Sequence, residues 1–106
     1  MRAGQLRERV TLQAPLRTPD GAGGADIGWS EVATLWARVE AQGGGELPAG
    51  ERLEARARLE VTIRFRADVT PAMRLLWRGR ALDIRASADS DGRRRFLTLD
   101  CMEGGA

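Results

Sequence analysis

The sequence predicts an all-β protein, a small antiparallel β-barrel with long loops, and three observations support this prediction. Apolar residues fall at every second position through most of residues 58–102. Polar residues occupy the positions between them, which is the pattern of half-buried antiparallel strands. The glycine-containing pairs Arg78-Gly79 and Asp91-Gly92 separate these stretches as hairpin turns. At 106 residues the chain is expected to form one domain, residues 1–106.

Two further strands are predicted in the first half of the chain. Residues 9–14 and 29–41 alternate in the same way, and we expect them to pair as a hairpin. Their inward side chains are Val10, Leu12, Leu35, Ala37 and Val39. Residues 15–28 contain Pro19-Asp20-Gly21 and three further glycines, a density of breakers that predicts an irregular loop.

The middle of the chain allows two interpretations. Residues 42–50 form a second glycine-rich loop, but residues 51–58 combine strand-like alternation with strong helix formers. We favour a short helix near residues 50–56, followed by a strand from about 58 to 66. A single unbroken hairpin arm is the competing interpretation, although it would be long for a strand.

The predicted core is thin. It consists of Val10, Leu12, Leu35, Val39, Val61, Ile63, Leu75, Leu82, Ile84, Leu97 and Leu99. Only five aromatic residues are present in the chain. A core of this size favours additional stabilisation by a partner surface.

Residue usage argues against an enzyme and against a bound cofactor or metal. All 17 basic residues are arginine, and histidine is absent. The chain therefore lacks a histidine base, an imidazole metal ligand and a phosphate-loop or Schiff-base lysine. Two-carboxylate chemistry stays formally open, but Asp83, Asp89, Asp91, Asp100 and Glu103 mostly occupy outward strand or turn positions. The pair Asp89 and Asp91 also lacks the further ligands of a calcium loop.

Charge and cysteine content give weaker indications. The net charge of +2 is small, so the arginines are weak support for nucleic-acid binding. Cys101 lies on an apolar strand face, where we expect a small buried hydrophobe in a protein compatible with a reducing compartment. The N-terminal residues lack an apolar segment, and no stretch reaches the length of a membrane span.

Exposed arginines and one tryptophan are the candidate interface residues. Arg93, Arg94 and Arg95 follow the predicted Asp-Gly turn, where they either form a solvated hairpin end or contact phosphates or neighbouring acids. Arg56 and Arg58 lie among glutamates, which favours contacts between subunits over tight DNA binding. Trp36 lies on the face opposite Leu35, where it either covers the barrel or anchors an interface.

Ordered sequence blocks add a resemblance that covers most of the chain. The blocks are Gly4-Gln5-Leu6-Arg7-Glu8-Arg9-Val10-Thr11-Leu12, then Trp29 and Val32-Ala33-Thr34-Leu35-Trp36-Ala37-Arg38-Val39, then Val61-Thr62-Ile63-Arg64-Phe65-Arg66, and finally Thr70-Pro71-Ala72-Met73-Arg74, Gly79-Arg80, Leu82-Asp83-Ile84 and Leu97-Thr98-Leu99-Asp100-Cys101. Together they resemble the head–tail joining family (head closure, or stopper) of tailed phages and gene transfer agents. No single block is specific, whereas the ordered set is fairly specific.

The resemblance implies a structural connector that assembles into a ring, commonly dodecameric. Its implied partners are other copies of itself, a portal or adaptor protein, a tail terminator or tail tube, and double-stranded DNA that passes through the lumen. The implied location is the host cytoplasm during assembly and then the neck of the particle. The loop between the second and third blocks would point into the lumen and help to retain DNA; its residues are Gln42, Gly43, Gly44, Gly45, Glu46, Leu47, Pro48, Gly50 and Arg52.

Two other functions are compatible with parts of this sequence. A related adaptor or tail-terminator role fits the same resemblance. A free-standing oligonucleotide-binding barrel ranks second, because such barrels combine stacking aromatics with a basic groove. The few aromatics and the small net charge of this chain make that alternative weaker.

Overall fold

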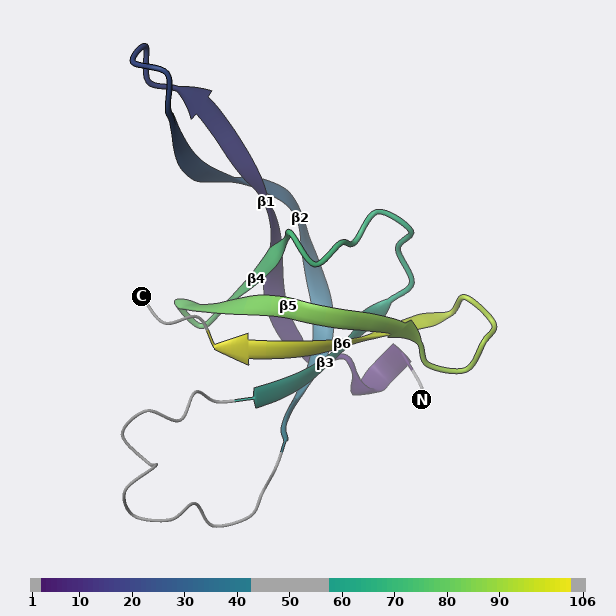
Figure 1. Ribbon diagram of the computed structural model, residues 1–106. Helices are drawn as coiled ribbons and strands as arrows, with labels where there is room; N and C mark the ends of the chain where they lie inside the picture. The colour runs from purple at the N-terminus through teal and green to yellow at the C-terminus, as the bar shows by residue number, and fades with distance from the viewer. Residues whose placement is uncertain (1–2, 43–57, 104–106) are drawn as a thin grey trace, which may run out of the picture.

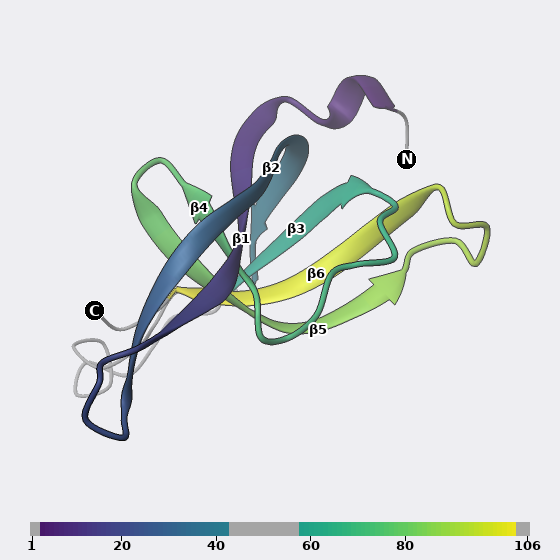
Figure 2. The same cartoon turned by 90° about the horizontal axis from the view of Figure 1, so that it is seen from above.

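A computed structural model describes residues 3–42 and 58–103, and these residues form an all-β structure (Figure 1). A short 3-10 helix, η1 (Ala3–Gln5), precedes six strands: β1 (Glu8–Pro19), β2 (Ala25–Ala41), β3 (Arg58–Arg64), β4 (Arg74–Trp77), β5 (Arg80–Asp89) and β6 (Phe96–Glu103). The strands pair antiparallel in the order β1-β2-β3-β6-β5-β4, and β4 pairs with β1 to close the barrel (Figure 2). The predicted fold class is therefore confirmed, whereas the short helix expected near residues 50–56 lies outside the described residues.

The core fills the barrel with aliphatic side chains from every strand. All of the predicted core residues are buried except Leu35 and Val39, which are partly buried and pack against the others. Leu6, Ala37, Leu59, Phe96 and Cys101 are buried as well. Cross-strand pairs such as Val10 with Leu35 and Val61 with Leu99 place apolar side chains directly opposite each other.

The irregular loop expected over residues 15–28 is wrong, because β1 and β2 continue through it as a projecting hairpin. Asp20 makes a compact turn possible: its Oδ1 accepts hydrogen bonds from the backbone N–H of Ala22 at 2.8 Å and of Gly24 at 3.1 Å. Pro15 and Pro19 are tolerated because this part of β1 pairs with β2 alone. We call the projecting part, residues 14–31, the arm; Figure 1 shows it extending away from the barrel.

The two predicted hairpin turns differ in outcome. Arg78 and Gly79 both have positive φ, 51° and 77°, which is the backbone of a two-residue turn that matches strand twist. Asp91-Gly92 instead belongs to a longer loop, residues 90–95, between β5 and β6. The hairpin expected there is confirmed, because β5 and β6 pair antiparallel, but its connection is longer than the minimal turn we expected.

Bulges interrupt the predicted alternation at two places. Ile84 pairs with Cys101, but Ala86 pairs with Asp100, so Arg85 is an extra residue in β5. Ala86 is consequently exposed, although strict alternation from Leu82 and Ile84 would predict that it points inward. In the first hairpin the register shifts beside Leu12, at the base of the arm.

Cys101 is predicted to stay unreactive in the folded protein. Its side chain is fully buried, and this burial raises the pKa of the thiol to about 12. The reactive thiolate is therefore scarce at pH 7–9. A disulfide reagent should modify Cys101 only in denaturant; rapid modification of the native protein would contradict this burial.

Candidate functional site

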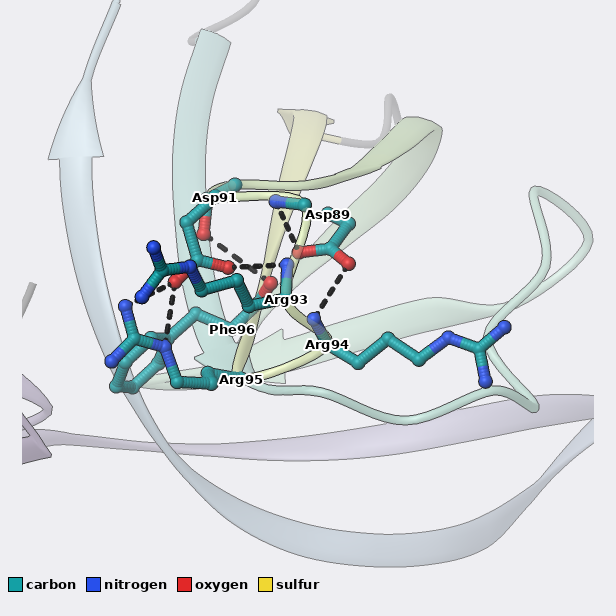
Figure 3. Close-up of polar contacts among 8 residues, drawn as sticks. Asp89, Asp91, Arg93, Arg94, Arg95 and Phe96 are labelled. Carbon is teal, nitrogen blue, oxygen red and sulfur yellow. Dashed lines mark hydrogen bonds and ion pairs between the residues drawn. The ribbon is translucent and has the colours of Figure 1, made fainter.

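The β5–β6 loop holds three consecutive arginines on a backbone fixed by two aspartates (Figure 3). Asp89 accepts hydrogen bonds from the backbone N–H of Gly92 at 3.1 Å and of Arg94 at 2.8 Å. Asp91 accepts one from the N–H of Arg93 at 2.9 Å. These contacts occupy donors that would otherwise point to solvent, and they hold the loop in one conformation.

The three arginines of this loop are not equivalent. Arg95 donates from Nε to Asp91 at 2.7 Å and forms an ion pair with it. Neither Arg93 nor Arg94 forms an ion pair with any residue that the structure describes. Figure 3 shows the Arg94 side chain extending away from both aspartates. Arg93 and Arg94 are therefore available to bind an anion or an acidic neighbour.

The loop should loosen in acid, because the charged Asp91 carboxylate accepts these hydrogen bonds more strongly than its protonated form does. The Arg93 N–H and, after it, the Arg95 guanidinium lower the pKa of Asp91 below its usual value. Because the pKa is lowered, the stabilisation that the charged Asp91 gives to the folded loop is present above about pH 4, the ordinary aspartate range. It is lost as the pH falls through the pKa of Asp91 in the folded protein. NMR titration of the Asp91 carboxyl should show this, and Arg95→Gln should raise the pKa only in part. An unchanged pKa in that variant would contradict the role of Arg95.

A second exposed surface surrounds Trp36, which is 52% exposed on the outside of β2. Arg9 pairs with Trp36 across β1 and β2, and its guanidinium carbon lies 4.4 Å from the indole centroid. A hollow of about 480 Å³ is lined by Leu6, Arg7, Trp36 and Arg64. A second hollow, of about 310 Å³, is lined by Thr34, Leu35, Trp36, Arg64, Phe65 and Arg66. We call these residues together with Arg9 the Trp36 surface.

The Trp36 surface combines apolar side chains with uncompensated positive charge. Arg66 is neutralised by Asp68 through two hydrogen bonds of 3.0 Å. Arg7 donates to the backbone oxygen of Gly4 at 3.2 Å. Arg9 and Arg64 form no ion pair within the described part of the chain. This surface therefore fits a ligand that is both apolar and acidic.

Arg58, another predicted interface residue, is already paired within the chain. Its Nη2 donates to both carboxylate oxygens of Asp100, at 3.3 and 3.2 Å. Beside it, Gln42 donates from Nε2 to Glu60 at 2.6 Å, and the Gln42 backbone N–H donates to the Arg58 carbonyl at 2.8 Å. Gln42 thus joins the ends of β2 and β3, and of the loop residues expected to point into the lumen it is the one that the structure describes. Arg56 and the rest of that loop lie outside the described residues.

The predicted interface residues lie in separate places. Trp36 is on the outside of β2, Arg58 begins β3, and residues 93–95 lie between β5 and β6. The arm was missed as a functional candidate because its prolines and glycines suggested a loop. The sequence did contain one indication, because Leu16 and Ile27 are large apolar residues in a glycine-rich segment. Both side chains are exposed in the structure, which is typical of a surface that binds a partner.

The described residues contain no group of three or more acidic, cysteine or histidine side chains placed to bind a metal ion. No helix in residues 3–42 or 58–103 is both long and apolar enough to cross a membrane.

Comparison with known proteins identifies a family, and the similar solved structures include the two described below. The sequence model of the phage head completion protein family matches residues 1–104. A chain of the virion of a native gene transfer agent particle is 28% identical, with a TM-score of 0.72, covering 95% of this chain and 97% of that one. A solution structure of a protein from Shigella flexneri 2a is 29% identical, with a TM-score of 0.71, covering 98% of this chain and 97% of that one. No curated protein is significantly similar to the chain.

Proposed function

The chain belongs to the phage head completion protein family, and we propose that it is the connector that closes the filled head and joins it to the tail. Membership makes it a structural component of a phage-like head and places it outside the enzyme families. In the proposed role, copies of the chain form a ring between the portal or adaptor protein and the tail. DNA passes through the lumen of this ring.

The observation that carries the proposal is the near-complete match to a chain of a gene transfer agent virion. The alignment covers almost the whole of both chains. The surfaces of the barrel support the same role. An exposed arm, an exposed Trp36 and the unpaired Arg93 and Arg94 are features of a protein that binds neighbours.

We further propose that residues 42–52 point into the lumen and help to retain packaged DNA. The argument comes from the sequence, because Gly43, Gly44 and Gly45 accept backbone conformations that other residues avoid. Glu46 would repel phosphates, so this loop would obstruct DNA without adhering to it.

Shortening residues 43–50 tests the loop separately from the ring. The shortened chain should still fold and join the neck, while tailless heads should lose their DNA. Nuclease-protected DNA per head is the measurement, and the parent chain is the control. Heads that retain as much DNA as the parent would show that this segment is only a connection.

Deleting the gene in a producing strain tests the connector role itself. We expect heads that lack tails and have lost their nuclease-protected DNA, and we expect the intact gene to restore both tail attachment and DNA protection. Electron microscopy of purified particles and a DNA protection assay measure the two effects. Normal tailed particles in the deletion strain would refute the proposal.

A further inference from the structure

We infer that the arm of one copy binds the Trp36 surface of a second copy of this chain. The inference rests on the proposed ring, and it identifies which two surfaces meet when neighbouring copies assemble. The arm, residues 14–31, and the Trp36 surface are different parts of the molecule, so their contact is head-to-tail. Contacts of this kind repeat from copy to copy and close into a ring when the rotation allows.

The arm lacks the support that the rest of the sheet receives. β4 pairs with β1 only at residues 11–13, and β3 pairs with β2 only at residues 37–41. Beyond these points β1 and β2 pair only with each other. A two-stranded ribbon is marginally stable in water, and this one exposes Leu16 by 53% and Ile27 by 60%. Burial against a partner would remove this apolar surface from water.

The Trp36 surface offers matching apolar contacts. Two hollows lie beside the indole, and their lining includes Leu6, Leu35 and Phe65. The large apolar side chains that are exposed in the described residues are Leu16, Ile27, Val32 and Trp36. All four lie on β1 or β2. If the arm of each copy contacts the Trp36 surface of the next copy, this one contact would bury exposed apolar side chains both on the arm and around Trp36.

Charge complementarity identifies the partner as another copy. The arm carries Asp20, Asp26 and Glu31 against one arginine, Arg17. Asp26 and Glu31 form no ion pair in the described structure. The Trp36 surface provides Arg7, Arg9 and Arg64 without a carboxylate partner for Arg9 or Arg64. The acidic, apolar arm is therefore complementary to the basic, apolar Trp36 surface. The opposite charges would determine how the two copies are oriented as well as how tightly they bind.

The contact must join two molecules. Ile27 and Trp36 lie on the same extended strand, nine residues apart, which corresponds to about 30 Å. Figure 1 shows the arm pointing away from the barrel. β1 and β2 stay paired with each other along the arm, and this ribbon leads away from the barrel, so position 27 lies far from Trp36 of the same molecule.

Photo-cross-linking in assembled particles tests the inference directly. A benzoylphenylalanine residue placed at position 27 should yield a product of two chains, and mass spectrometry should locate the second attachment near Arg7, Trp36 or Arg64. The same probe at position 85, an exposed site on β5, is the control and should not reach that surface. If the chain is in the particle but position 27 links to another protein, or to a different surface, the inference is wrong. Absence of the chain from the particle would instead overturn the proposed function.

A charge exchange provides an independent test. Arg64→Asp should lower the yield of tailed particles at least tenfold, and adding Asp26→Arg should restore most of it. Adding Asp83→Arg instead should not restore it, because Asp83 is an exposed acid on β5 outside both surfaces. Thermal unfolding of each purified variant should match the parent, since the three side chains are exposed. Equal recovery with Asp26→Arg and Asp83→Arg would contradict the inference.

Discussion

Replacing Ile63 by alanine is expected to lower the free energy of unfolding by about 2–5 kcal/mol. Ile63 is fully buried on β3, where it pairs with Ala37 of β2 and Leu97 of β6. The substitution removes three carbons from the centre of the barrel. A closed sheet collapses poorly around such a cavity, because moving one strand disturbs the hydrogen bonds of both neighbours. Denaturant unfolding of the purified protein measures the loss.

Ile27→Ala is the matched control, because it makes the same chemical change at a site that is 60% exposed. We expect a change within about 0.5 kcal/mol. Comparable losses at the two positions would contradict the burial of Ile63 and the isolation of the arm.

Replacing Trp77 by alanine is the second large effect we expect, about 3 kcal/mol of unfolding free energy. Trp77 packs against the core at one end of the barrel and donates from Nε1 to Glu8 at 3.0 Å. The guanidinium carbons of Arg78 and Arg80 lie 5.0 and 5.1 Å from the centroid of its ring. These arginines pair with Glu8 and Glu103. Removing the indole therefore removes the side chain that these two arginines and Glu8 contact at this end of the barrel.

Trp77→Phe separates packing from hydrogen bonding at this site. The phenyl ring keeps most of the packing, so this variant should retain most of the stability. The Trp77 hydrogen bond, followed by Arg78, lowers the pKa of Glu8. The stabilisation that charged Glu8 gives to the folded protein is present above the ordinary pKa of glutamate. It disappears as the pH falls through the lowered pKa of Glu8. The stability of Trp77→Phe should consequently depend less on pH in the acidic range. Equal losses for the alanine and phenylalanine variants would contradict the packing role.

The barrel was predictable because its strands follow a period of two with one apolar face. Val61, Ile63, Leu97 and Leu99 are buried as that pattern requires. The pattern fails at Arg85, where a bulge inserts one residue and turns Ala86 outward. A bulge depends on the register of the neighbouring strand, which local alternation does not contain.

The arm was not predictable from local preferences, because Pro15, Pro19 and four glycines indicate a loop. Its strands form because β2 pairs with β1 over the full length of β1, and because Asp20 stabilises the connecting turn. For the candidate site, the exposure of Trp36 and of residues 93–95 agrees with the sequence analysis. The pairing of Arg58 with Asp100 depends on the alignment of β3 with β6 and was not visible in the sequence.

An electron cryo-microscopy map of the particle neck tests the connector role most directly. We predict density for this barrel in a closed ring between the portal-side proteins and the tail, with DNA or an empty channel on its axis. Each arm should lie against the Trp36 surface of the neighbouring copy. A map that places the chain away from the head–tail junction, or that shows the junction complete without it, would contradict the account.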